Sequence, residues 1–367
     1  MKKVLAILLA ALVVFSMVGC NNAKEGKEIA VVTDVGQLMD GGFNQGTYEG
    51  AKAYAEANNK TYMYYQPANG SSATDNDRVA AMRQAIANGA KVIVAPGFLQ
   101  ENALRTVALE SPEVKFVFVD GWALDDGKGN LLKNLTAIVY KEQESGYLAG
   151  YAAVKDGYTK LGGTFGGGGS NPACNRFAYG FVQGAKDAAD ELGVDVEIKI
   201  SFKYGSSFSA SPELVAQMGS WYSSGTEVVF SCGGSMVQSV IQAANETKDG
   251  KVIGVDTDQS GLSDRVITSA MKGLSVSVQK VLGELYKGEW DAKLGGQASN
   301  LGAADDATGL PISTSRFAKF TADDYNAIYA KVKSGAVTPD ANVEGCDKAD
   351  FWNKAVEGSH VKVTFEE

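Results

Sequence analysis

The chain has 367 residues, of which 45% are hydrophobic and 21% charged, so it can bury a large core and two domains are expected. The 43 acidic residues outnumber the 34 basic ones, and no basic run follows the first three residues, which argues against a nucleic-acid partner. The single histidine, His360, lies seven residues from the C-terminus, which argues against a histidine-based catalytic triad or a histidine-rich metal site.

The N-terminus has the pattern of an export signal. Two lysines precede an apolar run over residues 4–18, which is shorter than the ~20 residues of a membrane-spanning helix. The sequence MVGC then resembles a bacterial lipobox, in which the cysteine becomes the lipid-modified first residue of the mature protein. We therefore expect a signal peptide over residues 1–19, a lipid anchor at Cys20, a polar tether over residues 20–27 and a location on the extracytoplasmic face of the cell membrane. An uncleaved anchor and an ordinary secretory signal are the alternatives.

The other cysteines give no sign of a disulfide framework or a zinc site. Cys174, Cys232 and Cys346 are odd in number, widely spaced and without a C-x-x-C pattern. We expect them to be small buried hydrophobic residues, and we expect no metal and no cofactor.

From residue 28 to residue 140, apolar runs alternate with helical patterns. The runs are continuous, which is typical of parallel strands covered by helices on both faces. The sequence predicts strands at residues 28–34, 62–66, 91–96, 115–120 and 135–140, and helices at residues 46–58 and 76–88.

The same alternation restarts after residue 141 without a linker, which indicates a second α/β unit. The sequence predicts a further extended segment at residues 266–272 and a helix at residues 274–287 that returns to the first half. The other predicted strands are residues 160–165, 196–202, 227–232 and 251–256, and the other predicted helices are residues 142–155, 177–192, 212–223 and 236–247.

The C-terminal part is less regular. Residues 291–318 are rich in glycine, and a helix is predicted over residues 322–334. Phe351 and Trp352 are expected to anchor the terminal segment to the body of the protein.

Several predicted strands end in a polar or glycine residue. Because ligands of open α/β sheets bind at the carboxyl ends of the strands, these residues would meet in one crevice; ordinary turn chemistry is the alternative. The strand ends are Asp34, Gly97, Asp120, Gly233 and Asp256.

Motifs of enzymes are missing from the sequence. The glycine cluster over residues 162–169 does not give G-x-G-x-x-G in any register, and neither a Walker A motif nor a G-x-S-x-G elbow occurs. The acidic pairs lie beside glycine, alanine or threonine, where solvated turns are the better interpretation. We therefore expect no enzymatic activity.

Four motifs carry a resemblance to a known family: VVTDVG at residues 31–36, DGGFNQGTYEG at residues 40–50, EQESGYLAG at residues 142–150 and GVDTDQ at residues 254–259. They resemble the basic membrane protein family of lipoproteins, which includes the purine nucleoside receptors of bacterial ABC transporters. The resemblance runs from about residue 28 to residue 290.

This resemblance implies a type I periplasmic-binding fold, in which two doubly wound parallel-sheet lobes are joined by a three-segment hinge and close over a ligand. The N-terminal lobe would comprise residues 28–140 plus about 267–290, and the C-terminal lobe residues 141–266. Residues 291–367 would complete one or both lobes. Closure would occur about segments near Tyr140 and Val266. The implied partners of this monomer are a purine nucleoside and a membrane permease.

The resemblance also implies roles for single residues. Phe43 matches the aromatic that stacks on one face of the base, and Phe208 is the candidate for the other face, with Phe177 and Trp122 as rivals. Asp34 and Asn44 match residues at the base edge. A strand-end turn is the alternative role for Asp34, and a helix N-cap is the alternative for Asn44.

The remaining matches concern the ribose. Asp120 and Asp258, with Asp256 as a competitor, match acids that accept hydrogen bonds from sugar hydroxyls. Lys272 matches a lysine that donates to a ribose oxygen, with a surface charge as the alternative. Gly233 would let the backbone approach the ligand.

Two other functions stay open on the same fold. One is a receptor for a sugar or another polyol, which would also use acids at strand ends with flanking aromatics. The other is a ligand-sensing surface lipoprotein that reports its loaded state to a partner protein.

Overall fold

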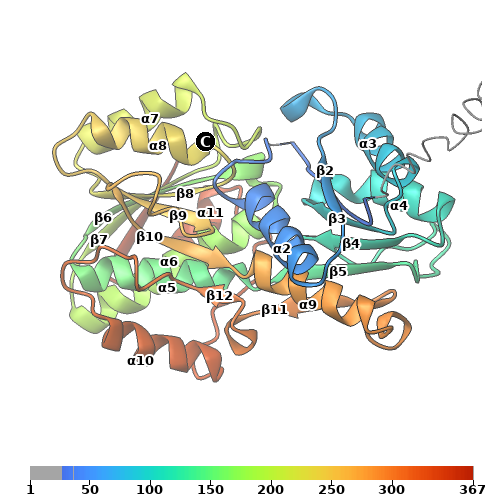
Figure 1. The fold of residues 1–367 in the computed structure, drawn as a ribbon. Coiled ribbons are helices and arrows are strands. Elements are labelled where there is room, and N and C mark those ends of the chain that lie inside the picture. The colour runs from blue at the N-terminus through green and yellow to red at the C-terminus, as the bar shows by residue number, and fades with distance from the viewer. Residues whose placement is uncertain (1–26, 36, 367) are drawn as a thin grey trace, which may run out of the picture.

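The computed structural model describes residues 27–35 and 37–366, which form two parallel sheets with helices on both faces (Figure 1). The expected signal peptide and the lipid attachment at Cys20 lie outside the described residues. Within the described part of the chain, no helix combines the length and apolar character that crossing a membrane requires.

The first sheet has six strands, all parallel, in the order β11-β5-β4-β3-β1-β2. Its strands are buried by α2 and α9 on one face and by α3 and α4 on the other, as the continuous apolar runs predict. We call this sheet and its helices the first lobe. The elements are β1 (Ile29–Val32), α2 (Phe43–Ala57), β2 (Tyr62–Tyr65), α3 (Asp75–Ala87), β3 (Val92–Pro96), α4 (Glu101–Glu110), β4 (Lys115–Val119), β5 (Leu135–Tyr140), α9 (Leu274–Tyr286) and β11 (Ala298–Leu301).

The second sheet has seven strands in the order β12-β10-β9-β8-β6-β7-β13, and only β12 runs antiparallel to its neighbour. Helices α5 and α6 cover one face, and α7 and α8 cover the other. We call this unit the second lobe. The elements are α5 (Glu142–Asp156), β6 (Lys160–Phe165), α6 (Pro172–Leu192), β7 (Val196–Ser201), α7 (Pro212–Ser223), β8 (Val228–Cys232), α8 (Met236–Asn245), β9 (Lys251–Asp256), β10 (Val266–Lys272), β12 (Thr308–Gly309), α10 (Ala322–Lys333), α11 (Ala349–Ala355) and β13 (Val361–Glu366).

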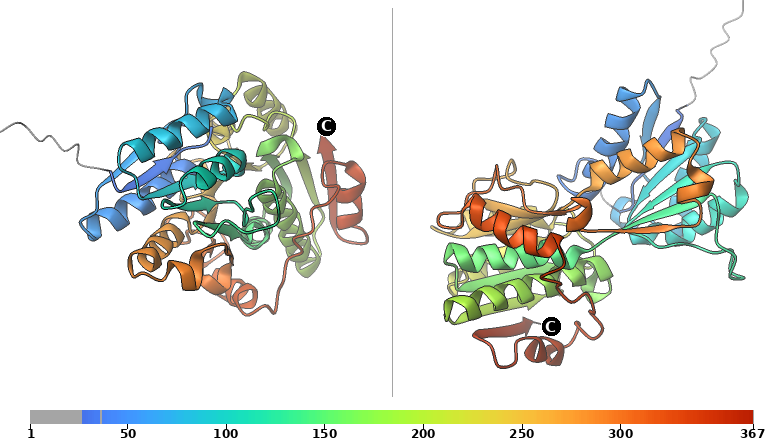
Figure 2. Two further views of the ribbon diagram at one scale, coloured as in Figure 1. Left: turned by 90° about the vertical axis from the view of Figure 1, so that its right-hand side faces the viewer. Right: turned by 90° about the horizontal axis from the view of Figure 1, so that it is seen from below.

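The chain crosses between the lobes three times, so the predicted two-lobe fold with a three-segment hinge is confirmed. The crossings lie between β5 and α5, between β10 and α9, and between β11 and β12. Figure 2 shows the lobes side by side, with the C-terminal strand at the outer edge of the second lobe.

The expected lobe boundary at residue 267 is wrong, because β10 pairs with β9 and belongs to the second sheet. Helix α9, which follows directly, packs on α2 of the first lobe. Residues 291–367 contribute to both lobes: β11 extends the first sheet, and β12 and β13 extend the second.

Two helices begin earlier than the sequence patterns predict. Helix α2 begins at Phe43 because Asp40, from outside the helix, accepts hydrogen bonds from the amides of Gly42 and Asn44 over 2.8 and 3.0 Å. Helix α6 begins at Pro172, because Asn171 caps it and proline is favoured at the first helical position.

Helices α5 and α6 touch through their backbones. Gly146 and Gly150 of α5 face α6, and Gly180 and Gly184 of α6 face α5. A methyl group at Gly184 would overlap the carbonyl oxygen of Tyr147, so the helix pair depends on glycine at this position.

The start of α5 ties the hinge segments together. The Ser145 hydroxyl donates to the Met271 carbonyl over 2.7 Å and accepts from the Gly309 amide over 2.9 Å. The Glu144 carboxylate accepts hydrogen bonds from the Ala303 amide over 2.6 Å and from the Thr308 hydroxyl over 2.8 Å. The first turn of α5, which directly follows the crossing from β5, therefore binds the crossing after β10 and the crossing between β11 and β12.

Candidate ligand-binding site

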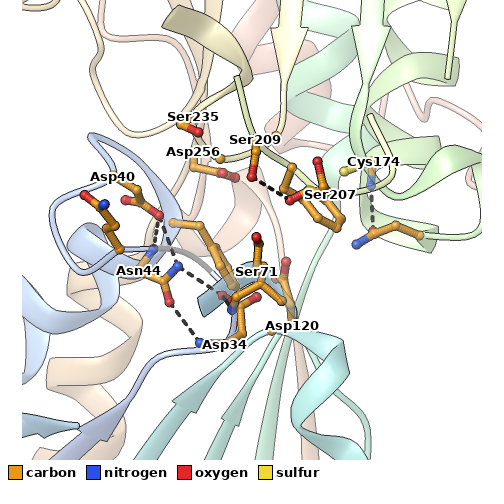
Figure 3. Close-up of a pocket in the computed structure, with 18 of the residues that line it drawn as sticks. Asp34, Asp40, Asn44, Ser71, Asp120, Cys174, Ser207, Ser209, Ser235 and Asp256 are labelled. Atoms are coloured by element: carbon orange, nitrogen blue, oxygen red, sulfur yellow. Dashed lines mark hydrogen bonds between the residues drawn. The ribbon is translucent and has the colours of Figure 1, made fainter. Parts of the chain in front are cut away.

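A cavity of about 520 Å³ lies between the lobes, which is within the usual size range of a small-molecule site. Figure 3 shows side chains of the first lobe, including Asp34, Asn44 and Asp120, facing Asp256 and Ser207 of the second. All of the residues expected to contact the ligand line this cavity except Asp258: Asp34, Phe43, Asn44, Asp120, Phe208, Gly233, Asp256 and Lys272.

The carboxyl ends of the strands position the charged groups of the cavity. Asp120 follows β4, and Asp256 and Lys272 end β9 and β10. Asp120 and Asp256 have positive φ angles of 58° and 67°, a left-handed conformation that aspartate tolerates better than most residues. The chain therefore turns sharply at both acids and leaves their side chains at the cavity.

Asp258 does not line the cavity, so the structure does not support its expected place beside the ribose. Its carboxylate accepts hydrogen bonds from the Thr314 hydroxyl over 2.6 Å and from the Ser260 amide over 3.0 Å. These bonds hold it in the loop after β9, and its competitor Asp256 takes the position at the strand end.

The candidate aromatics come from opposite lobes. Phe43 is the first residue of α2, and Phe208 lies in the loop between β7 and α7. Phe208 has a φ of 57°, which is strained for a bulky residue. The Phe208 ring packs directly against Gly166 and Gly233. A methyl group at Gly166 would overlap this ring, and a methyl group at Gly233 would lie 3.1 Å from it.

The two rival aromatics occupy different surroundings. Phe177 lines the cavity but is buried in the core of the second lobe, with its ring centroid 5.4 Å from Lys272 Nζ. Trp122 does not line the cavity and packs against Phe118 with ring centroids 5.8 Å apart. Among the described residues, three partly buried aromatics line the cavity: Phe43 and Phe98 from the first lobe and Phe208 from the second. Phe98, which directly follows Gly97 after β3, was missed by the sequence analysis.

Asn44 connects two aspartates at the first-lobe side of the cavity. Its amide group donates to Asp34 Oδ1 over 3.0 Å and to Asp40 Oδ2 over 3.1 Å. Asn44 lies inside α2, and Asp40 does the capping, so the alternative of Asn44 as an N-cap is wrong. Asp40 also lines the cavity and was missed by the sequence analysis.

Lys272 is the centre of a buried charge cluster. Its ammonium binds Asp120 and lies 3.3 Å from Glu142 Oε1 and 3.8 Å from Asp256 Oδ1. Burial alone lowers the pKa of Lys272, but the three carboxylates outweigh it and hold that pKa well above its usual value. The alternative of a surface charge is wrong, because Lys272 is buried.

The acids of this cluster titrate unusually. Burial raises the pKa of Asp256 to about 7, although Lys272 opposes the shift. Burial also raises the pKa of Asp120, against the effect of Lys272. Among the described residues, Asp120 Oδ1 is buried without a hydrogen-bond partner, which leaves an acceptor for a ligand hydroxyl.

Several cavity residues were not predicted because they lie beyond the strand ends that the sequence analysis considered, either in the loops after the strands or in the first turn of the next helix. They follow β2, β3, β6, β7 and β8, so continuing each predicted strand by several residues is the signal that would have found most of them. The polar and sulfur-bearing members are Gln66, Ser71, Asn171, Cys174, Ser207, Ser209, Ser235 and Gln238.

The lobes also touch beside the cavity. The Gly41 carbonyl of the first lobe accepts hydrogen bonds from the Thr257 hydroxyl over 2.9 Å and from the Gln259 amide group over 3.0 Å. The loop that follows β1 is therefore joined to the loop that follows β9.

A family model described as "ABC transporter substrate-binding protein PnrA-like" (Bmp) matches residues 27–336. This chain belongs to the Bmp family. The resemblance to basic membrane proteins is thereby confirmed, and the Bmp chain is a substrate-binding protein rather than an enzyme. As such it acts outside the cytoplasm with a ligand and a permease as partners.

Two relatives illustrate the similarity. The ABC transporter nucleoside-binding protein BmpA of Lactococcus lactis subsp. cremoris is 30% identical over 321 residues, which cover 79% of this chain and 86% of the relative. Basic membrane protein B of Borrelia garinii subsp. bavariensis is 33% identical over 228 residues, which cover 61% of this chain and 63% of the relative.

Among solved structures, an ABC transporter solute-binding protein from Aeropyrum pernix K1 superposes with a TM-score of 0.69 at 20% identity. The match covers 89% of this Bmp chain and 95% of the other chain, which shows a shared fold.

Proposed function

We propose that this Bmp protein captures purine nucleosides in the cavity between its lobes and delivers them to a membrane permease. The observation that carries the proposal is the pairing of two aromatics from opposite lobes with a set of acids and one lysine at the strand ends. The name of the Lactococcus lactis relative, a nucleoside-binding protein, supports it.

The base would lie between Phe43 and Phe208. Each aromatic face contributes about 1–3 kcal/mol when it stacks on a nucleobase. Because the rings belong to different lobes, a flat ligand would contact both when the lobes approach each other.

The base edge would face Asp34 and Asn44, with Asp40 behind them. The two carboxylates accept hydrogen bonds, and Asn44 already donates to both, so this group favours a base edge that carries N–H donors. Gly233, which has a φ of 146°, would let the backbone of the second lobe approach the ligand from the other side.

The ribose would lie at the charge cluster. A sugar diol offers two donors, and Asp120 and Asp256 are acceptors from opposite lobes. Lys272 ends β10 between them and can donate to a ribose oxygen.

We also propose that Cys20 carries the lipid that keeps the protein at the extracytoplasmic face of the membrane. The lipobox-like sequence before Cys20 supports this. The wild-type protein should incorporate a labelled fatty acid and a Cys20→Ser variant should not, and equal labelling of the two, or no labelling of the wild type, would contradict a lipid at Cys20.

The function is tested by isothermal titration of lipid-free residues 21–367, refolded to remove bound ligand, with adenosine, guanosine, inosine, cytidine, ribose and free purines. Purine nucleosides are expected to bind tightly. Phe43→Ala and Phe208→Ala should each weaken adenosine binding by at least about tenfold with little change in melting temperature, because each removes one stacking face.

Trp122→Ala is the matched control, since Trp122 lies outside the cavity. Unchanged affinity in both phenylalanine variants would remove them from the site. A response to ribose or another sugar without a response to nucleosides would favour the polyol receptor, which the acids at the strand ends would also suit.

A further inference from the structure

Glu142 lies between two cations beside the candidate ribose site. It is the first residue of α5 and is fully buried. Its Oε2 accepts a hydrogen bond from Arg176 Nε over 2.6 Å, and its Oε1 lies 3.3 Å from Lys272 Nζ. One carboxylate therefore bridges the guanidinium of α6 and the ammonium at the end of β10.

The three acids around Lys272 are not equivalent. Asp120 and Asp256 line the cavity, whereas Glu142 does not. Among the described residues, Asp120 Oδ1 and Glu142 Oε1 are both buried without a hydrogen-bond partner, but Glu142 Oε1 lies 3.3 Å from Lys272 Nζ and Glu142 Oε2 accepts a hydrogen bond from Arg176, so both oxygens of Glu142 face cations. Two acids are thus positioned for a ligand, and the third is committed to the protein.

A buried ammonium needs a counterion at all times, because an unpaired charge inside a protein is costly. When Asp120 and Asp256 accept hydrogen bonds from a ligand diol, their interaction with Lys272 weakens. A carboxylate that no ligand can reach would keep Lys272 charged and in place during this exchange.

Resting on the nucleoside-binding function proposed above, we infer that Glu142, held by Arg176, is the fixed counterion of Lys272 and a positioning residue for recognition of the ribose hydroxyls. Without Glu142, the ammonium would be drawn onto Asp120 and Asp256, and a ligand would have to break these contacts.

The first test compares two ligands that differ in their hydroxyls. Glu142→Gln should raise the Kd of adenosine about tenfold, as expected for the loss of one buried charge partner. It should leave the Kd of 2′,3′-dideoxyadenosine within about twofold, because that ligand lacks the diol. Glu144→Gln is the matched control: Glu144 is buried two residues further along α5 and binds Ala303 and Thr308, but not Lys272.

The second test needs no ligand and reports on charge rather than on folding. Asp256 faces Lys272, and the charges of Asp120, Asp40 and Glu142 also act on it. Because the charge of Glu142 raises the pKa of Asp256, Glu142→Gln should lower this pKa from about 7. The titration is followed by NMR of the carboxyl carbons, and the signal of Asp256 is assigned by its absence in Asp256→Asn. Glu144→Gln should leave the titration in place.

An unchanged Asp256 titration together with an equal loss for both ligands would overturn the inference. If the wild-type protein binds no nucleoside, the proposed function fails, whereas the NMR titration still decides the role of Glu142. If Glu142→Gln does not fold, Glu142→Asp keeps the charge but shortens its reach, and a smaller change in the same direction is expected; no change would count against the counterion.

Discussion

Asp256 is a cavity residue whose charge changes near neutral pH. Burial at the strand end raises the pKa of Asp256, and the charge of Lys272, 3.8 Å away, lowers it. The effect of burial is the larger one, and the pKa is about 7. The ordinary value in an unfolded chain is about 3.9. Between these values the folded protein holds a proton that the unfolded chain releases.

This difference predicts opposite effects of pH on stability and on binding. Because the folded state binds more protons between about pH 4 and pH 7, the empty protein should lose stability as pH rises through this window. The ionised carboxylate is the better acceptor for ribose hydroxyls, so adenosine affinity should fall below pH 7, approaching about tenfold per pH unit.

Asp256→Asn checks both effects, because asparagine does not titrate. We expect a higher melting temperature than wild type at pH 8, at least tenfold weaker adenosine binding and a flatter affinity profile between pH 6 and pH 8. Calorimetry and titration across this range measure these quantities. A wild-type affinity that is independent of pH would show that the ligand does not contact the Asp256 carboxylate.

The acids after β9 show what the sequence can predict at this scale. The GVDTDQ motif contains both Asp256 and Asp258, and the sequence places both near a strand end. The choice between them depends on a bond from Thr314, 56 residues further along the chain. Such a long-range contact leaves no local pattern, whereas Lys272 and Asp120 could be found because they follow clear apolar strands.

At the scale of elements, α5 and α6 of the second lobe pack against each other at backbone-to-backbone distance. The four facing glycines occur as two pairs spaced four residues apart, which places each pair on one side of its helix. Their contacts are with backbone atoms of the partner helix, which cannot rotate away as a side chain can.

Gly184→Ala should therefore destabilise the protein by about 3 kcal/mol or more, since overpacking typically costs about 1–3 kcal/mol and here the obstacle is the Tyr147 carbonyl. Gly219→Ala is the control. Gly219 also lies inside a helix, α7, but an added methyl group there meets open space, so stability should rise by about 0.5–1 kcal/mol. Urea unfolding measures both changes, and equal effects would mean that the helix contact is unimportant.

Most of the elements that the sequence analysis did not predict are short or polar; the exception is α4, a ten-residue helix with a buried apolar face. Strand β12 has two residues and β11 is the polar sequence ASNL, so neither has an apolar run, and both exist because they pair with β10 and β5. Strand β13 reads VKVTFE and alternates in polarity, which is a recognisable edge-strand pattern. Most of the long elements were predictable because buried strands and amphipathic helices carry their own periodicity.

At the scale of the whole molecule, the lobes are joined by the hinge, by the ion pair between Lys272 and Asp120 and by the contact at Gly41. The hinge segments are bound together at the start of α5, while the contact at Gly41 consists of two hydrogen bonds. The contact at Gly41 and the ion pair between Lys272 and Asp120 both lie outside the hinge, and both must break when the lobes separate to release a ligand.

Thr257→Val removes one of these bonds and keeps the shape of the side chain. We expect adenosine to dissociate about two- to tenfold faster, the usual effect of one hydrogen bond, with little change in the association rate. Stopped-flow fluorescence measures both rates. Thr314→Val is the control, because its bond to Asp258 stays within the second lobe; equal dissociation rates in the two variants would exclude Gly41 as a link between the lobes.

The pairing of β13 with β7 affects how the chain is made. The ribosome delivers β7 long before β13, so a nascent chain presents an unpaired strand edge that is covered when Val361–Glu366 arrives in register beside it. A chain that is cut short would keep this edge open as a template for pairing with another molecule.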